Sequence, residues 1–189
     1  MKFKHIRPTK EHEQAALEYI QEFKEYHSQI NGAGGLDRFL DDYDSWLLKL
    51  EDDRHRIPDE NRVPAETFFL VREEEHKIVG MINIRLALND KQRRYGGHIG
   101  YSIRPTERNK GYNKINLYLG LLCLKHYGVK EALLDCDKDN LASSKTMLAF
   151  DAKLIKEFYD DLYEHCIVQD YLIDIDLAIC KYKDQSESI

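Results

Sequence analysis

The sequence predicts an α/β fold, in which a mixed, twisted and mostly antiparallel sheet has a central parallel strand pair and helices on both faces. Two strand-like runs joined by a short polar turn, within residues 67–86, indicate an antiparallel hairpin. A strand, a long apolar helix and another strand then follow one another within residues 96–136, which is the order of a parallel crossover. Two amphipathic helices precede both features and would cover one face of the sheet.

The N-terminal third is predicted to contain one strand and two helices. Residues 2–7 form the strand, and Thr9 is the expected N-cap of the first helix. Apolar side chains recur at helical spacing between residues 16 and 30, and the glycine-rich segment 31–35 ends this helix. A second apolar stripe, over residues 36–50, indicates the second helix.

The remaining elements alternate strands and helices. Residues 96–104 show the two-residue alternation of a strand, and Pro105 ends it. The helix that follows is apolar on most sides, so we expect it to be buried between layers. A loose tail is expected at residues 180–189. In chain order, the predicted elements are strands Thr67–Arg72, Lys77–Leu86 and Gly96–Arg104, helix Gly111–Tyr127, strand Ala132–Cys136, helix Leu141–Phe150, and strands Leu154–Tyr159 and Cys166–Ile175.

Length and composition indicate one domain, spanning residues 1–189. This is the size of a single domain, and 42% hydrophobic with 33% charged residues is typical of globular proteins. No apolar run reaches the ~20 residues of a membrane span. The N-terminus also lacks the apolar core of a signal peptide, so a cytoplasmic protein without membrane contact is expected. A net charge of −6 argues against nucleic-acid binding.

Cysteine and histidine do not cluster, and we expect neither a metal site nor a disulfide. The four cysteines are far apart, lie in apolar segments and form no CxxC pair. The eight histidines are scattered without an HxxxH pair. We therefore interpret the cysteines as buried free thiols.

The most informative stretch is a basic turn between the strand that ends near Arg104 and the helix that begins at Gly111. Backbone N–H groups at a helix start have no intrahelical partner, and the helix dipole adds partial positive charge there. A pyrophosphate would satisfy both features. Gly111 lets the main chain approach such a ligand closely. Four cations accompany a single anion, Glu107, in this segment: Arg104, Arg108, Lys110 and Lys114.

Two other anion-binding loops are disfavoured by the residues of this turn. It is not a Walker A loop, because no Gly-Lys-Ser/Thr sequence follows, and it lacks the glycines of the G-x-G-x-x-G dinucleotide fingerprint. Nucleoside triphosphate and dinucleotide binding therefore lose support. A plain helix start with a solvated basic turn stays open, since the string R-x-x-G-x-N is short.

The segment 96–122 resembles the pyrophosphate-binding motif of the GNAT superfamily of N-acetyltransferases, in its bacterial small-molecule branch. The family motif lies between a strand and a helix. It has Gln or Arg, then two residues of any kind, Gly, one residue of any kind, and Gly or Ala. This chain offers Arg108 and Gly111 at the first and fourth positions. The resemblance covers about residues 66–150.

The resemblance implies that acetyl-CoA is the co-substrate, with no metal. The main chain around Ile103 would pair with the pantetheine arm, and Asn140 would contact pantetheine or order the splayed strands. Ser143 would lie near the edge of the cofactor. A V-shaped opening between the strand ending near Arg104 and the strand at 133–136 would admit the arm. The pyrophosphate would be held by Arg108, Asn109, Lys110, Gly111, Tyr112 and Asn113.

The chain departs from the family pattern at three points. Asn113 stands where Gly or Ala is usual, although the phosphate ligands there are mainly backbone N–H groups. After Met147 the family's Asn-Gly-Gly turn is replaced by AFDAKLIKEF. The acid tyrosine that is frequent in the helix after the asparagine is missing, because residues 141–150 contain none. The acceptor pocket is therefore less well defined than the cofactor loop.

The implied activity is transfer of the acetyl group to a primary amine of a small molecule or peptide by direct attack. Such a transfer needs a neutral amine, a donor for the developing oxyanion and a proton for the leaving thiolate. His98 and Tyr101 are the candidate base and acid, on the strand that would pass the thioester. Alternation points them to opposite faces, so we do not expect both to act. Asn83 and Arg85 could recognise an acceptor carboxylate or pair internally, and we favour the internal pair.

Acetyl-CoA and an amine acceptor are thus the expected partners, and a homodimer stays open. The acidic net charge gives a cationic acceptor a slight preference. A non-catalytic acyl-CoA-binding module of the same fold is the alternative function. An interaction protein that uses only the fold is a third, against which the intact basic turn argues.

Overall fold

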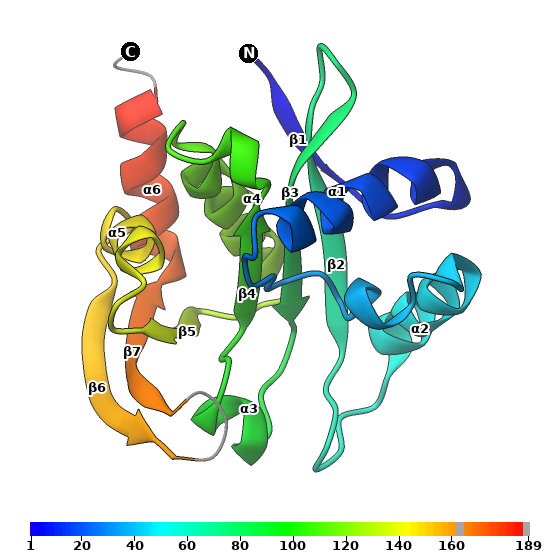
Figure 1. The fold of residues 1–189 in the computed structure, drawn as a ribbon. Helices are drawn as coiled ribbons and strands as arrows, with labels where there is room; N and C mark the ends of the chain where they lie inside the picture. Colours follow the sequence, from blue (N-terminus) through cyan, green and yellow to red (C-terminus); the bar gives the residue numbers. More distant parts are fainter. Residues whose placement is uncertain (162–164, 187–189) are drawn as a thin grey trace.

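The computed structural model describes residues 1–161 and 165–186, and its strands form two sheets (Figure 1). The first sheet has four strands in the order β1-β2-β3-β4, and the second has three in the order β5-β7-β6. Every strand pairing in the described part of the chain is antiparallel. The strands are β1 (Phe3–Ile6), β2 (Ala65–Arg72), β3 (Lys77–Arg85), β4 (Ile99–Ile103), β5 (Glu131–Asp137), β6 (Lys153–Asp160) and β7 (Cys166–Asp174).

Helices cover both faces of the first sheet, which confirms the predicted fold class. The neighbouring residues Met81 and Ile82 of β3 point into opposite cores, because side chains alternate along a strand. Met81 packs with Trp46 under α1 and α2, and Ile82 packs with Leu117 of α4. The helices are α1 (Glu13–Glu25), α2 (Tyr43–His55), α3 (Asp90–Arg94), α4 (Tyr112–His126), α5 (Leu141–Leu148) and α6 (Ile175–Ser186), with 3-10 helices η1 (Lys10–His12), η2 (Leu36–Arg38) and η3 (Pro105–Glu107). Within the described ranges, none is long and apolar enough to cross a membrane.

The two N-terminal helices are shorter than their apolar stripes indicate. α1 ends at Glu25, two residues before His27, whose φ of 47° is incompatible with a continuing right-handed helix. α2 begins at Tyr43, because the preceding Asp42 accepts a backbone N–H from the first turn as its N-cap. The apolar residues from Leu36 onward instead start a separate 3-10 helix.

Two other helices differ from the prediction. α3 was not predicted, and the side chain of Asn89 caps it. Residues 180–186, predicted as a loose tail, belong to α6, because Tyr182 stacks on Phe150 with ring centroids 5.1 Å apart. The rest of the predicted tail, 187–189, lies outside the described residues.

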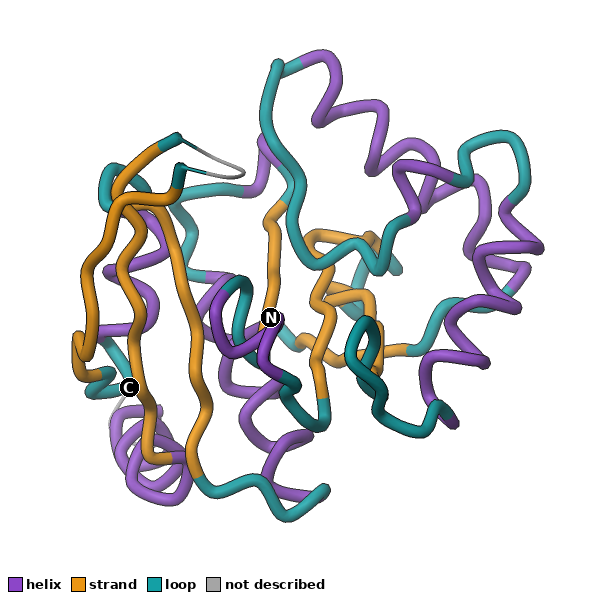
Figure 2. The backbone as a smooth tube through the Cα atoms, turned by 90° about the horizontal axis from the view of Figure 1, so that it is seen from below, coloured by secondary structure: helices purple, strands orange, loops and turns teal. Residues whose placement is uncertain are grey.

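The two sheets meet between β4 and β5. The His98 N–H donates to Leu133 O (2.6 Å), and the Leu133 N–H donates to His98 Nδ1 (3.0 Å). The imidazole thus accepts the Leu133 N–H, which a continuing β-ladder would use for a backbone hydrogen bond. In the described part of the chain, no ladder joins β4 to β5. The strands predicted to be parallel neighbours therefore belong to different sheets, as Figure 2 shows. This split corresponds to the V-shaped opening that the sequence predicts.

Candidate active site

The turn before α4 presents a row of backbone N–H groups. Gly111 is the N-cap of α4 with a φ of 79°, and Asn109 also has a positive φ, of 60°. This alternation of left-handed residues turns successive N–H groups toward one concave side. In the part of the chain that the structure describes, the N–H groups of residues 109–113 donate to no acceptor. The main chain of the turn is therefore free to bind an anion.

The side chain of Arg108 does not extend toward this concave side. Its Nε donates to Ile103 O (3.2 Å), and Nη2 donates to Ser28 Oγ (2.7 Å). The guanidinium also lies over the Phe23 ring, 5.3 Å from the centroid. Arg108 thus fastens the turn to β4 and α1.

Two more of the predicted cations are engaged with the protein. Arg104 pairs with Glu22 at 3.2 Å, and Lys110 Nζ donates to Glu107 Oε2 at 2.8 Å. Among the described residues, Lys114 is the cation of this segment without an acceptor. Three of the four cations of this segment therefore brace the turn through contacts within the protein.

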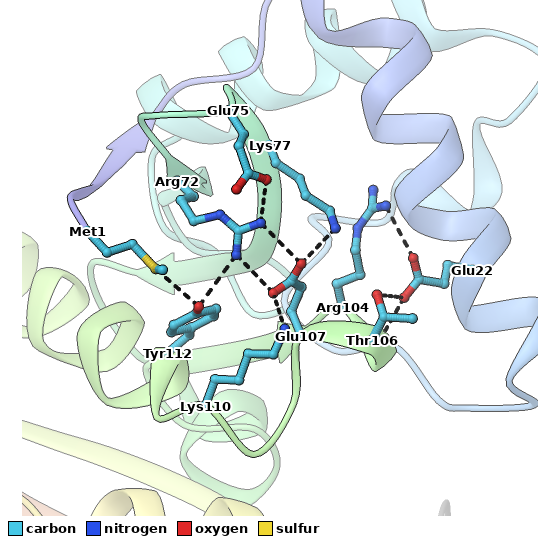
Figure 3. Close-up of polar contacts among 10 residues, drawn as sticks. All are labelled: Met1, Glu22, Arg72, Glu75, Lys77, Arg104, Thr106, Glu107, Lys110 and Tyr112. Atoms are coloured by element: carbon cyan, nitrogen blue, oxygen red, sulfur yellow. Dashed lines mark hydrogen bonds and ion pairs between the residues drawn. The ribbon is translucent and has the colours of Figure 1, made fainter.

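Glu107 is buried behind the turn, and its carboxylate contacts several cationic side chains (Figure 3). Burial alone would raise its pKa, but hydrogen bonds from Lys110, Lys77 and Arg72 lower the pKa to about 2. The carboxylate is therefore ionised at any pH at which the protein would work.

Tyr101 reaches from β4 across the opening to α5. Its hydroxyl lies 2.8 Å from Ser143 Oγ, and burial raises the pKa of the phenol. Ser143 is itself fixed, because its N–H donates to Asn140 Oδ1 (3.1 Å) and Asn140 is the N-cap of α5. Tyr101, Ser143 and Asn140 are therefore brought together, as the predicted site requires.

The last two residues of the predicted loop point into the protein. Tyr112 is buried, and its hydroxyl accepts from Arg72 Nη1 (3.4 Å). Asn113 Nδ2 donates to Thr146 Oγ1 (3.3 Å) and links α4 to α5. Only the backbone N–H groups of both residues are left to face a ligand.

The imidazole of His98 is buried in a contact between the two sheets and is not exposed to a substrate. Its Nδ1 accepts from the Leu133 N–H, only 9% of its surface is exposed, and burial lowers its pKa to about 4. A neutral, enclosed imidazole at the junction of the sheets holds β4 against β5.

The buried His98 makes the protein acid-sensitive. The unfolded imidazole takes up a proton below pH ~6.5 and the folded one only near pH 4, so stability falls as the pH falls through this window. Between pH 7 and pH 5 the loss from His98 is about 2 kcal/mol. Urea unfolding of the wild type and His98→Gln at both pH values checks this. The variant is expected to lose about 2 kcal/mol less, and equal losses would contradict the assignment.

An open cleft of about 1290 Å³ lies beside Tyr101, Asn140 and Ser143 and also reaches Asn83 and Arg85. The turn residues 108–113 do not line it. The cleft and the row of N–H groups are therefore separate features of the surface.

Asn83 and Arg85 bond internally, as favoured from the sequence. Arg85 Nη1 donates to Gly96 O and Gly97 O, at 2.8 Å each. Asn83 Nδ2 donates to Thr67 Oγ1 (3.0 Å). Neither side chain is positioned as a free recognition group for an acceptor carboxylate.

All four cysteines are free thiols, but their burial differs from the prediction. Cys136 is buried, Cys123 and Cys166 are half-buried and Cys180 is exposed. Cys180 is exposed because it lies on the outer side of helix α6. In the described part of the chain, no group of three or more His, Cys, Asp or Glu side chains could hold a metal ion.

The sequence matches the acetyltransferase (GNAT) domain family over residues 5–153. The chain therefore belongs to this family, and the enzyme class that the resemblance implied, an acetyltransferase, is confirmed. No curated protein matches the sequence significantly.

Solved structures share the fold at low sequence identity. RimJ of Mycobacterium smegmatis in complex with CoA-disulfide has a TM-score of 0.75 and 12% identity, over 97% of this chain and 89% of that one. The ribosomal-protein-S5-alanine acetyltransferase from Vibrio fischeri has a TM-score of 0.69 and 15% identity, over 93% and 94%. A chimera of the spermidine N-acetyltransferase SpeG from Vibrio cholerae and hSSAT has a TM-score of 0.65 and 10% identity, over 95% and 99%.

Proposed function

We propose that this chain transfers the acetyl group of acetyl-CoA to a primary amine of a small molecule or peptide by direct attack. One observation carries the proposal: the split between β4 and β5 lies beside a turn whose backbone N–H groups, at residues 109–113, have no acceptor in the described chain. CoA joins a pyrophosphate to a long pantetheine arm, and these two features suit its two parts. Membership of the family and the CoA disulfide bound to RimJ support the same ligand.

The outer edge of β4 supports the path of the pantetheine arm. β4 is the last strand of the first sheet, so the backbone groups on its outer edge, near Ile103, face the opening. The amides of pantetheine can bond to such an edge as an added strand does. In this arrangement Asn140 fixes the start of α5 on the other side of the arm.

Tyr101 is our candidate for the acid that protonates the leaving thiolate. It lines the cleft, and its hydroxyl is held by Ser143 of α5. A phenol whose pKa is raised by burial stays protonated at neutral pH and can donate. The family's frequent tyrosine is missing from α5, and Tyr101 reaches the same helix from β4.

The acceptor amine is proposed to lose its proton before it attacks, without a histidine base. Below the pKa of the amine, its neutral fraction rises about tenfold per pH unit. His98 and Tyr101 add no titration between pH 6 and pH 9, because their pKa values are lowered to about 4 and raised, respectively.

Activity toward a simple alkylamine is therefore expected to climb steadily from pH 6 to pH 9. The measurement is kcat/KM for the amine at saturating acetyl-CoA. A flat profile would show that deprotonation of the amine does not control the rate.

The cleft accommodates more than one class of amine. Its lining carries both signs of charge, including Asp53 and Asp135 as well as Lys49 and Arg62. Two proteins with this fold act on different amines, by their names a ribosomal protein and spermidine. A useful acceptor panel therefore contains short peptides with free N-termini and polyamines, with the cationic amines slightly preferred for this acidic chain.

The replaced Asn-Gly-Gly turn and the missing α5 tyrosine keep a non-catalytic acyl-CoA-binding module as the second candidate. A thiol-release assay with acetyl-CoA and the acceptor panel, beside a CoA titration, separates the two. Thiol release with an N-acetylated product supports the enzyme. CoA binding without release with any amine supports the module. A chain that shows neither would overturn both proposals.

A further inference from the structure

We propose that Glu107 is the positioning residue of the CoA-binding turn, an inference that rests on the proposed function. Glu107 ends η3, and its side chain is 4% exposed. It accepts hydrogen bonds from Arg72 Nη1 (3.0 Å), Lys77 Nζ (2.6 Å) and Lys110 Nζ (2.8 Å), which converge on it in Figure 3. Arg72 and Lys77 are distant from Glu107 in the sequence, whereas Lys110 is three residues after it.

The contacts attach both sides of the turn to the hairpin of β2 and β3. Arg72 is the last residue of β2, and Lys77 is the first of β3. Glu107 precedes the turn, Lys110 lies within it, and Tyr112 follows it and accepts from Arg72 (3.4 Å). The segment 108–111 is thus held from both ends, while the N–H groups of residues 109–111 donate to no acceptor in the described part of the chain.

The charges of this cluster are arranged to favour an anion on its outer side. Three cations surround Glu107, and Glu75 accepts from Arg72 Nη2, which also donates to Glu107 Oε1 (3.4 Å). Because the carboxylate is buried and ionised, breaking these contacts would leave charge without partners, so they hold the turn firmly. Lys110 is 47% exposed and keeps part of its charge near the open side.

Positioning and simple electrostatics predict opposite results when Glu107 loses its charge. A negative charge close to a diphosphate repels it, so removal of that charge alone would strengthen CoA binding. If the carboxylate instead holds the turn in the binding conformation, its removal weakens binding, because the ligand must then order the turn. The sign of the change in affinity therefore decides between the two.

The experiment compares Glu107→Gln, Glu107→Asp and the control Glu75→Gln with the wild type. Glu75→Gln removes a carboxylate from the same arginine but touches no residue of the turn. Free CoA is titrated by calorimetry, and kcat and the KM for acetyl-CoA are measured with one amine. We expect about a tenfold weaker CoA affinity for Glu107→Gln, a smaller loss for Glu107→Asp, and a change within about twofold for Glu75→Gln.

A positioning role also predicts that kcat at saturating acetyl-CoA changes by less than about twofold, since the ligand orders the turn once it is bound. Unchanged or tighter CoA binding by a folded Glu107→Gln protein would overturn the inference alone. Should that variant fail to fold, Glu107→Asp decides, because it keeps the charge and shortens only the reach. Wild-type affinity in Glu107→Asp would then overturn it. A wild type that does not bind CoA would overturn the proposed function as well.

Discussion

Gly111→Val is expected to weaken CoA binding by about a hundredfold or more while the protein stays folded. A branched residue does not tolerate the φ of 79° at this N-cap, so the backbone must turn and misalign its N–H groups. Loss of two charge-assisted N–H bonds, at about 1.5 kcal/mol each, corresponds to this factor. The fold should survive, because a Cβ at Gly111 meets no atom within 4 Å. Calorimetric titration with CoA measures the loss.

Gly128→Val is the matched control for that variant. Gly128 follows the other end of α4, has the same φ of 79°, and its Cβ would also meet nothing within 4 Å. Both variants should therefore lose similar stability, but only Gly111→Val should lose affinity for CoA. Arg108→Ala should lower the affinity less than Gly111→Val, because its guanidinium braces the turn from Ile103 and Ser28. Wild-type affinity in a folded Gly111→Val protein would show that this turn is only a helix start.

Tyr101→Phe is expected to lower kcat by about a hundredfold, with little change in the KM for acetyl-CoA. General acid catalysis typically contributes on the order of 10²–10⁴ in rate, and this change removes the proton but leaves the ring in place. The variant also leaves Ser143 Oγ without its partner across the opening. Steady-state kinetics with one amine at pH 8 give both constants.

Tyr19→Phe provides the matched control for the tyrosine. Tyr19 is also buried, and its hydroxyl lies 3.1 Å from Ser102 Oγ, the residue next to Tyr101 on β4. Its hydroxyl does not line the cleft. We expect kcat within about threefold of the wild type for Tyr19→Phe. A similar fall in both variants would assign the loss to disturbance of β4, and unchanged kcat in Tyr101→Phe would remove it as the acid.

Patterns that depend on one element were predictable from the sequence. The period-two run of β4, the apolar length of α4 and the hairpin of β2 and β3 all formed close to the predicted bounds. The turn before α4 was found because Gly111 and the adjoining basic residues form a local motif. The opening between β4 and β5 followed from the family resemblance, and the two strands do lie in different sheets.

Features that depend on distant partners were not predictable. From the sequence, the side chains of Arg108 and Lys110 were expected to bind an anion. In the structure Arg108 donates to Ser28 and Lys110 donates to Glu107. Only the fold brings Arg108 to Ser28. His98 was a candidate base from the sequence, but the fold buries its imidazole. The helical structure of residues 180–186 depends on the stacking of Tyr182 on Phe150, two residues that are far apart in the sequence. A lone acid such as Glu107 in a basic segment was the one signal that a buried network was present.

The most direct test is an amide NMR titration of the wild-type protein with CoA. If the main chain of the turn holds the pyrophosphate, the N–H signals of residues 109–113 should show the largest shifts in the spectrum, because they gain charged acceptors. Signals near Ile103 on the outer edge of β4 should shift as the pantetheine arm binds. CoA that binds tightly while the signals of residues 109–113 stay unmoved would contradict the account.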